Sequence, residues 1–207
     1  MMKMGEINLA KDKFNQVYKN NSAAWGYEPA ICLKEWMKEF PENATVLDLG
    51  CGVGRNANYL AKNRFWVVGY DWSPIAITKA LSESNATFEL KDIMNESWGD
   101  DQYDVVIDFG AFHFFTPELR SHYHKQLNKV LKSGGIYINE SGRYKDDMII
   151  QSKYNSDLSV RYIPPALTKD VWEEFDYLTI EKLEENILPP HGHYGEYLCW
   201  NIFARKL

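Results

Sequence analysis

Short apolar runs alternate with helical stretches over residues 45–139, and this alternation constrains the fold more than any other feature of the chain. It is typical of βαβ units, in which helices connect the strands of a parallel sheet. Two of the helices are expected to begin with a capping residue followed by proline, at Ser73-Pro74 and Thr116-Pro117. The predicted strands are 45–49, 65–70, 87–90, 103–109 and 136–139. The sequence therefore predicts an α/β protein with a doubly wound sheet.

Both ends of the chain depart from this alternation. Residues 8–19 and 30–40 carry two helical patterns, which predict a helical extension before the first strand. After a polar insertion at 143–165, two strand-like segments, 177–183 and 197–204, are joined by a short connection rich in glycine and proline. A connection of this length predicts an antiparallel hairpin at the end of the chain.

The composition is that of an ordinary globular protein, since 45% of the 207 residues are hydrophobic and 25% are charged. This length predicts one domain. A formal net charge of −6 does not favour phosphate backbones or anionic membranes, so we expect a small-molecule partner and neither nucleic acid nor membrane. Three cysteines without zinc-ligand spacing predict reduced thiols, no bound metal and a cytoplasmic location. We expect a monomer or a homodimer.

A turn rich in glycine, with Gly50, Gly52 and Gly54, lies between the first predicted strand and the helix after it. Glycines at this point let a ligand approach the backbone closely, at the sheet edge where open α/β folds bind ligands. A dinucleotide fingerprint would need its third glycine at the position of Arg55. Asp48, just before the turn, would repel a pyrophosphate but attract a cationic amino-acid group. The turn therefore favours S-adenosylmethionine over NAD.

Acidic residues recur where three successive strands end, at Asp48, Asp71 and Asp92. A glycine turn required only for packing would not account for this recurrence. Asp71 is placed to accept hydrogen bonds from ribose hydroxyls. Asp92 is placed to accept from an adenine amino group, with Ile93 and Trp72 as apolar walls, unless Trp72 packs against the first helix instead.

Residues 45–141 resemble the class I S-adenosylmethionine-dependent methyltransferases. Residues 46–54 resemble their glycine-loop motif, 69–74 their ribose-binding second strand, and 131–135 their turn before strand five. The resemblance implies a Rossmann-like, doubly wound, seven-stranded sheet with the last strand antiparallel, plus an N-terminal helical lid. It also implies S-adenosylmethionine as cofactor and S-adenosylhomocysteine as product.

The resemblance implies a single domain over residues 1–207. Its parts would be the lid at 1–40, a cofactor-binding core at 41–142 and an acceptor-side part at 143–207 with the C-terminal hairpin. The residues implied to bind the cofactor are Trp25, Asp48, Gly50, Cys51, Gly52, Gly54, Arg55, Asn56, Asp71, Trp72, Ser73, Asp92, Ile93, Asp108, Phe109 and Gly110.

Three histidines are candidate catalytic residues: His113 at the crest of the sheet, and His191 and His193 in the last hairpin loop. An imidazole can take a proton near neutral pH or orient an acceptor. The simpler alternatives are a buried histidine that binds the lid backbone and exposed turn residues. Glu140 and Arg143 lie near the same expected pocket, unless they form a surface ion pair.

The segment 108–120 resembles the small thiol and chalcogenide methyltransferases of the thiopurine and tellurite-resistance type, and Trp25 lies in a segment that resembles their lid tryptophan. We therefore predict methyl transfer to a small molecule and favour a thiol or chalcogenide acceptor, because a thiol is already partly ionised and strongly nucleophilic at neutral pH. The alternatives are an O- or N-methyltransferase, and a cofactor-binding protein without catalysis.

Overall fold

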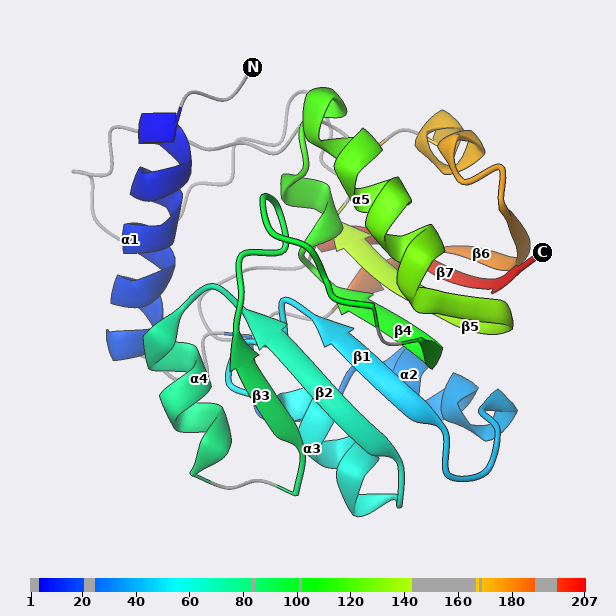
Figure 1. Ribbon diagram of the computed structural model, residues 1–207, viewed down its shortest axis with the longest axis horizontal. Helices are drawn as coiled ribbons and strands as arrows, with labels where there is room; N and C mark the ends of the chain where they lie inside the picture. Colours follow the sequence, from blue (N-terminus) through cyan, green and yellow to red (C-terminus); the bar gives the residue numbers. More distant parts are fainter. Residues whose placement is uncertain are drawn as a thin grey trace.

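The computed structural model describes residues 4–20, 25–82, 85–100, 102–142, 167, 169–188 and 197–207, with only the backbone of 4–9, 188 and 197. The strands are β1 (Thr45–Leu49), β2 (Trp66–Asp71), β3 (Thr87–Leu90), β4 (Tyr103–Phe109), β5 (Leu131–Gly142), β6 (Leu178–Leu188) and β7 (Tyr197–Lys206). The helices are α1 (Met4–Asn20), α2 (Ile31–Trp36), α3 (Arg55–Lys62), α4 (Pro74–Leu81) and α5 (Pro117–Val130), with the 3-10 turns η1 (Met37–Glu39), η2 (Phe112–Phe114) and η3 (Lys169–Glu174). Figure 1 shows one twisted sheet between two layers of helices.

The sheet has the strand order β3-β2-β1-β4-β5-β7-β6. Strands β1 to β5 pair in parallel, whereas β7 is antiparallel to both β5 and β6. The predicted seven-stranded, doubly wound sheet with an antiparallel last strand is therefore confirmed. The order reverses between β1 and β4, and in open α/β sheets a ligand crevice forms outside the carboxyl ends of the strands at such a reversal.

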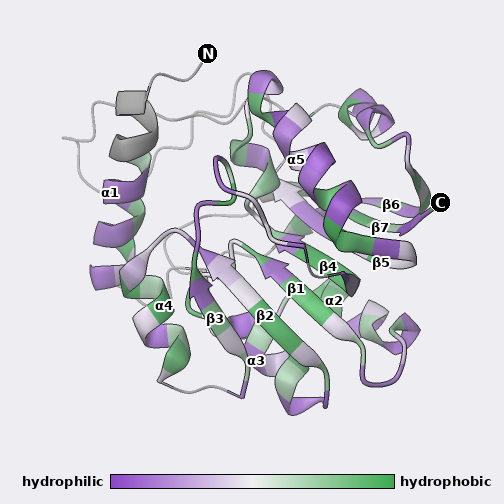
Figure 2. Ribbon diagram, viewed as in Figure 1, coloured by the Kyte–Doolittle hydropathy of each residue, from purple (hydrophilic) through white to green (hydrophobic). Residues whose placement is uncertain are grey.

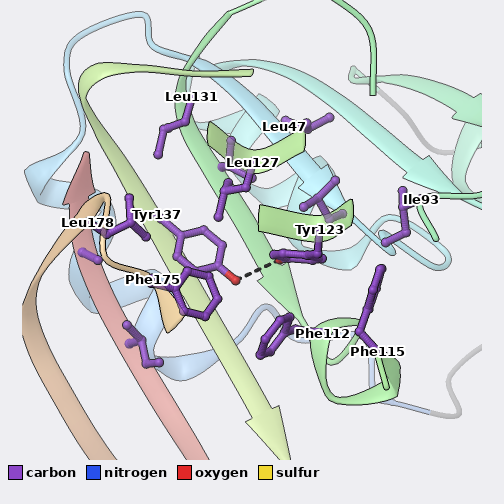
Figure 3. Close-up of a cluster of buried hydrophobic side chains, with 14 of the residues drawn as sticks. Leu47, Ile93, Phe112, Phe115, Tyr123, Leu127, Leu131, Tyr137, Phe175 and Leu178 are labelled. Carbon is purple, nitrogen blue, oxygen red and sulfur yellow. Dashed lines mark hydrogen bonds between the residues drawn. The ribbon is translucent and has the colours of Figure 1, made fainter. Parts of the chain in front are cut away.

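Each face of the sheet has its own buried core. On one face, Val46, Ile107 and Ile138 pack under α2, α3 and α4. On the other face, Leu47 and Val106 belong to a core that includes residues of α5 and η3. The residues of this core labelled in Figure 3 are Leu47, Ile93, Phe112, Phe115, Tyr123, Leu127, Leu131, Tyr137, Phe175 and Leu178. Figure 2 shows the apolar colour concentrated on the central strands. This layering follows from the near-continuous apolar runs of strands that are buried on both faces.

Several elements differ in length from the sequence prediction: α1 spans Met4–Asn20 instead of 8–19, and β7 ends at Lys206 instead of residue 204. The helix expected at 30–40 ends at Trp36 and continues as η1, because Phe40 precedes a proline and takes an extended conformation. Strand β5 begins at Leu131 instead of residue 136, since Leu131 pairs with Tyr103 and an irregularity in the strand accommodates Gly134 at a φ of +73°. Strand β6 extends to Leu188 because its pairing with β7 continues to that residue.

Strands β6 and β7 belong to the same sheet as β1 to β5. The division into lid, core and acceptor-side part stays a prediction, and the insertion at 143–165 lies outside the described residues. Within the described ranges, every helix is too short or too polar to span a lipid bilayer.

Candidate cofactor and acceptor site

The glycine turn between β1 and α3 has a backbone that only glycine adopts easily. Gly50, Gly52 and Gly54 have φ values of +67°, +56° and +81°. A Cβ atom on Gly50 would stand 2.8 Å from the Cβ of Ala111, and one on Gly54 would stand 2.7 Å from the Phe88 ring. The turn is therefore closely packed against its neighbours. Because these three residues have no side chains, the turn presents its backbone at the carboxyl edge of the sheet.

Asp71, the last residue of β2, connects this turn to the start of α4. Its Oδ2 accepts a hydrogen bond of 2.9 Å from the Gly52 N–H, and its Oδ1 accepts one of 2.8 Å from the Ser73 N–H. Burial raises the pKa of Asp71 to about 6, although both hydrogen bonds favour the ionised form. A carboxylate oxygen accepts more than one hydrogen bond, so Asp71 retains capacity for a ligand hydroxyl at the predicted ribose position.

Asp48 carries a buried carboxyl oxygen without a partner. Only 1% of the residue is exposed, and Oδ2 makes no hydrogen bond within the described part of the chain. Burial raises the pKa of Asp48 to about 8, and the nearby Asp108 adds to this effect while Arg55 opposes it. A buried carboxyl with one unpaired oxygen next to the glycine turn fits a ligand that brings a positive charge, because such a charge would offset the cost of ionising it.

A family comparison agrees with this geometry. Residues 46–135, from the middle of β1 to the glycines in β5, match the model of a methyltransferase domain. Residues 46–135 form a class I S-adenosylmethionine-dependent methyltransferase domain. Its cofactor, S-adenosylmethionine, has the cationic sulfonium and amine that Asp48 would attract and the ribose that Asp71 would bind.

Two curated relatives share this domain. The chain is 35% identical over 99 residues, 45% of its length, to the 2-heptyl-1-hydroxyquinolin-4(1H)-one methyltransferase of Mycobacteroides abscessus. It is 28% identical over 162 residues, 75% of its length, to the 2-methyl-6-phytyl-1,4-hydroquinone methyltransferase of Synechocystis. The alignments cover 44% and 49% of these two proteins, so the chain spans about half the length of the relatives it matches.

Solved structures share the fold over most of the chain. One comes from work on the conversion of a disulfide bond into a thioacetal group during echinomycin biosynthesis; it has a TM-score of 0.77 at 24% identity and covers 95% of this chain and 92% of its own. TehB from Haemophilus influenzae has a TM-score of 0.68 at 21% identity, covering 95% of this chain and 67% of its own. At these identities the likeness establishes the fold.

Helix α1 lies beside α4 and over the glycine turn of the methyltransferase domain (Figure 1). The Tyr18 hydroxyl stands 2.9 Å from where a Cβ on Gly52 would lie, and the Ser73 hydroxyl donates to Asn15 Oδ1. Ser73 also caps α4 by accepting from the Ala76 N–H. The predicted lid helix therefore contacts two of the predicted cofactor-binding residues directly.

An aromatic cluster joins α1 and the segment after it to the sheet. The ring of Phe14 lies 5.7 Å from that of Trp25, 5.6 Å from that of Trp72 and 5.4 Å from that of Phe114, measured between centroids. Tyr18 lies 5.3 Å from Trp25. Both tryptophans predicted to line the cofactor site, Trp25 and Trp72, therefore pack against Phe14 of α1. The alternative that Trp72 packs against the first helix is the arrangement observed.

Asp92, after β3, is bound by α1 as well. Its Oδ1 accepts from the Met94 N–H at 3.0 Å, and its Oδ2 accepts from Asn95 at 2.9 Å and from Lys11 Nζ at 2.7 Å. Burial alone would raise the pKa of Asp92, but the hydrogen bonds from Lys11, Asn95 and Met94 outweigh it and lower the pKa. Ile93 is buried in the core next to it. The adenine-binding role of Asp92 stays a prediction. An adenine amino group that binds there would have to displace Lys11 from Asp92 or share the carboxylate with it.

We expect Lys11→Met to loosen α1 from the domain. The substitution removes the ion pair with Asp92 but keeps the aliphatic stem, and a pair of this partial exposure contributes about 1 kcal/mol. The amide protons of α1 should then exchange with deuterium roughly fivefold faster, as measured by mass spectrometry. Lys19→Met, at an exposed position of the same helix, is the control. Equal exchange in all three proteins would contradict the assignment of Lys11 as an anchor.

Two predicted cofactor residues at the start of α3 hold the segment that follows the lid helix. Arg55 donates from Nη1 to the Trp25 carbonyl at 2.8 Å and to the Glu28 carbonyl at 3.2 Å. Asn56 Oδ1 accepts from the Ala30 N–H at 3.0 Å. These side chains therefore hold the segment between α1 and α2 beside the start of α3.

Cys51 and Asp108 have mainly structural partners. The Cys51 thiol is buried 2.9 Å from where a Cβ on Gly69 would lie, while its backbone N–H donates to the Tyr70 carbonyl. Asp108 Oδ1 accepts from the N–H of Ala111 at 2.7 Å and of Phe112 at 3.2 Å, and Oδ2 accepts from the Tyr123 hydroxyl at 2.7 Å. Tyr123 in turn binds the Tyr137 hydroxyl at 2.8 Å, the dashed line in Figure 3.

These bonds fix the turn after β4, in which Phe109 is half-buried and Gly110 has a φ of +101°. His113 in that turn is buried, and its Nδ1 accepts from the Gly142 N–H at the end of β5 at 3.2 Å. Burial lowers the pKa of His113 to about 3, so the imidazole is neutral near pH 7. A role of His113 in catalysis stays a prediction, and a neutral imidazole would act by orienting the acceptor. His191 and His193 lie outside the described residues.

Sequence reasoning missed the residues of α1 that contact the predicted cofactor site. Lys11, Phe14, Asn15 and Tyr18 all meet the domain, and their spacing of three, four and seven places them on one helix face. That spacing is the signal that identifies the face. Glu140 is only 6% exposed, which does not fit a surface position, but Arg143, its partner in the predicted ion pair, lies outside the described residues, so that alternative stays a prediction.

Proposed function

We propose that this protein transfers the methyl group of S-adenosylmethionine to a small-molecule acceptor. The observation that supports the proposal most strongly is the pair of carboxyl groups beside the glycine turn: Asp71 with its backbone hydrogen bonds, and Asp48 with its unpartnered Oδ2. Bound there, the cofactor supplies an electrophilic methyl group on a positively charged sulfur. The chain itself would bind the two reactants, align them and keep water away.

We further propose that the reacting atom of the acceptor is a thiol or chalcogenide. The described residues at the crest of β4 and β5 offer half-buried aromatic rings, a neutral His113 and the carboxyl of Glu140, whose pKa burial raises to about 7. Moving a proton to that carboxyl costs about 2 kcal/mol from a thiol and about 4 kcal/mol from a phenol. The sulfur chemistry associated with the echinomycin structure points the same way.

A hydroxyl acceptor is the second candidate. The two curated relatives are named for a hydroxyquinolone and a hydroquinone, both of which carry ring hydroxyls. The half-buried rings of Phe109 and Phe114 would suit a flat acceptor of this kind. A protein that binds the cofactor without catalysis is the third candidate.

We also propose a cytoplasmic location. The buried, reduced thiols of Cys32, Cys51 and Cys199 support it.

A mixed panel of acceptors tests these alternatives. The protein is incubated with S-adenosylmethionine and an alkyl thiol, an aromatic thiol, a selenol, a hydroxyquinolone, a hydroquinone and an amine, and methylated products are identified by mass spectrometry. We expect thiol and selenol products at rates at least tenfold above those of the oxygen and nitrogen acceptors. Turnover of the ring hydroxyls alone would select the second candidate. Tight cofactor binding in calorimetry without any product would select the third.

A further inference from the structure

Glu140 belongs to the row of side chains that reaches the carboxyl edge of the sheet on the same face as Asp48. It pairs with Phe109 of β4 on one side and with Asn201 of β7 on the other, and Asp48 pairs with Ile107, one alternation before Phe109. Because side chains alternate along a strand, Asp48, Ile107, Phe109 and Glu140 share one face. Strand spacing and rise put the Cα atoms of Asp48 and Glu140 about 12 Å apart.

The carboxyl group of Glu140 has little to bind. Its Oε2 accepts a long hydrogen bond of 3.9 Å from the Cys32 thiol of α2, and Oε1 makes no hydrogen bond in the described ranges. Asp108 differs from it: that carboxyl is buried in the same crest but accepts from two backbone N–H groups and a tyrosine hydroxyl. A buried carboxyl that serves only the fold is normally saturated with donors, as Asp108 is, because an unsatisfied one costs free energy.

The two thiols that face Glu140 do not exchange protons near pH 7, whereas the carboxyl of Glu140 does. Burial raises its pKa to about 7, against the opposing positive charge of Arg55 at the start of α3. The thiols of Cys32 on α2 and Cys199 on β7 both have raised pKa values, because they are buried and face the Glu140 carboxylate, so they stay protonated. The positive charge of Arg55 opposes the effect of burial at Asp48 as well as at Glu140.

We propose that Glu140 is a catalytic residue that binds the methyl acceptor and removes its proton. This inference rests on the proposed function. As the acceptor sulfur forms its bond to the methyl carbon, its S–H proton moves to a Glu140 oxygen. The bond between that carbon and the cofactor sulfur breaks, and its electron pair stays on the cofactor sulfur. The products are a methyl thioether, S-adenosylhomocysteine and a protonated Glu140, which then releases its proton to water.

The variant Glu140→Gln tests this step with two acceptors. An alkyl thiol is mostly protonated at pH 7 and needs the base, whereas an aromatic thiol is largely ionised on its own. At saturating cofactor we expect kcat/KM to fall about 100-fold for the alkyl thiol and only a few-fold for the aromatic thiol. The rise of the wild-type rate with pH, centred near pH 7, should disappear in the variant. Glu39→Gln, an exposed carboxyl on η1, is the control with the same change of charge.

Three further measurements separate the outcomes. Glu140→Gln should melt no lower than the wild type and bind S-adenosylmethionine with unchanged affinity, and Glu140→Asp should recover part of the alkyl-thiol rate. Equal losses on both thiols, or no loss on either, would overturn the role of Glu140 while leaving the proposed function intact. A wild-type protein that methylates no acceptor would overturn the proposed function, and the role of Glu140 with it.

Discussion

Asp71→Ala is expected to weaken S-adenosylmethionine binding by about 100-fold or more while the chain remains folded. The substitution removes the acceptor of the Gly52 and Ser73 N–H groups and, in the complex, the acceptor for the ribose hydroxyls. Hydrogen bonds to a charged group contribute roughly 1.5–3 kcal/mol each, and two of them account for a loss of this size. Calorimetric titration at pH 8, where Asp71 is ionised, measures the change in Kd.

Two variants accompany this measurement. Asp71→Asn keeps one oxygen acceptor and should lose less affinity than alanine, while Asp176→Ala removes an exposed carboxyl before β6 and should change nothing. The pH dependence has a definite sign. Since burial raises the pKa of Asp71 to about 6, wild-type affinity should decline as the pH falls below 6, and the Asp71→Ala protein should lack that decline. Wild-type affinity in Asp71→Ala would refute the ribose assignment.

Much of the sheet can be predicted from the sequence because its strands are bounded by residues that end them. The predicted limits 45–49, 87–90 and 103–109 agree with β1, β3 and β4. Strand β5 was harder, since its first residues form a strand only through pairing with Tyr103, against the local preference of Ser133, Gly134 and Gly135 for a turn. Pairing between distant segments decided that boundary.

The candidate site divides in the same way. Asp48 and Asp71 sit at strand ends, so the parallel register alone brings them to one edge, and local sequence predicts their meeting. The contacts of Lys11, Asn15 and Tyr18 depend on how α1 packs against the rest of the fold. The spacing of residues along a helix shows which of them share a face, but not what that face packs against. The burial of Glu140 depends on α2, whose Cys32 lies 108 residues earlier in the chain, and on β7 at the C-terminal end. Local sequence around Glu140 therefore does not predict it.

Asp48→Asn is expected to stabilise the protein and to weaken cofactor binding at once. Burial raises the pKa of Asp48 to about 8, whereas an aspartate in the unfolded chain titrates near 3.9. Between these values the folded chain holds a proton that the unfolded chain has released, so wild-type stability falls as the pH rises from 4 to 8. At pH 7 this penalty is about 4 kcal/mol, and asparagine, which does not titrate, is free of it.

The melting temperatures of wild type and Asp48→Asn should therefore be similar near pH 4 and separate by several degrees at pH 8, with the variant higher. Added S-adenosylmethionine should reverse the order, because its positive charge stabilises the ionised Asp48 and gains less from an amide. The exposed Glu39→Gln removes one carboxylate without burial and should show neither effect. A variant that melts lower than the wild type at pH 8 would mean that Asp48 has a structural partner. A variant that melts higher and binds the cofactor less tightly would identify Asp48 as a group held at the expense of stability for its ligand.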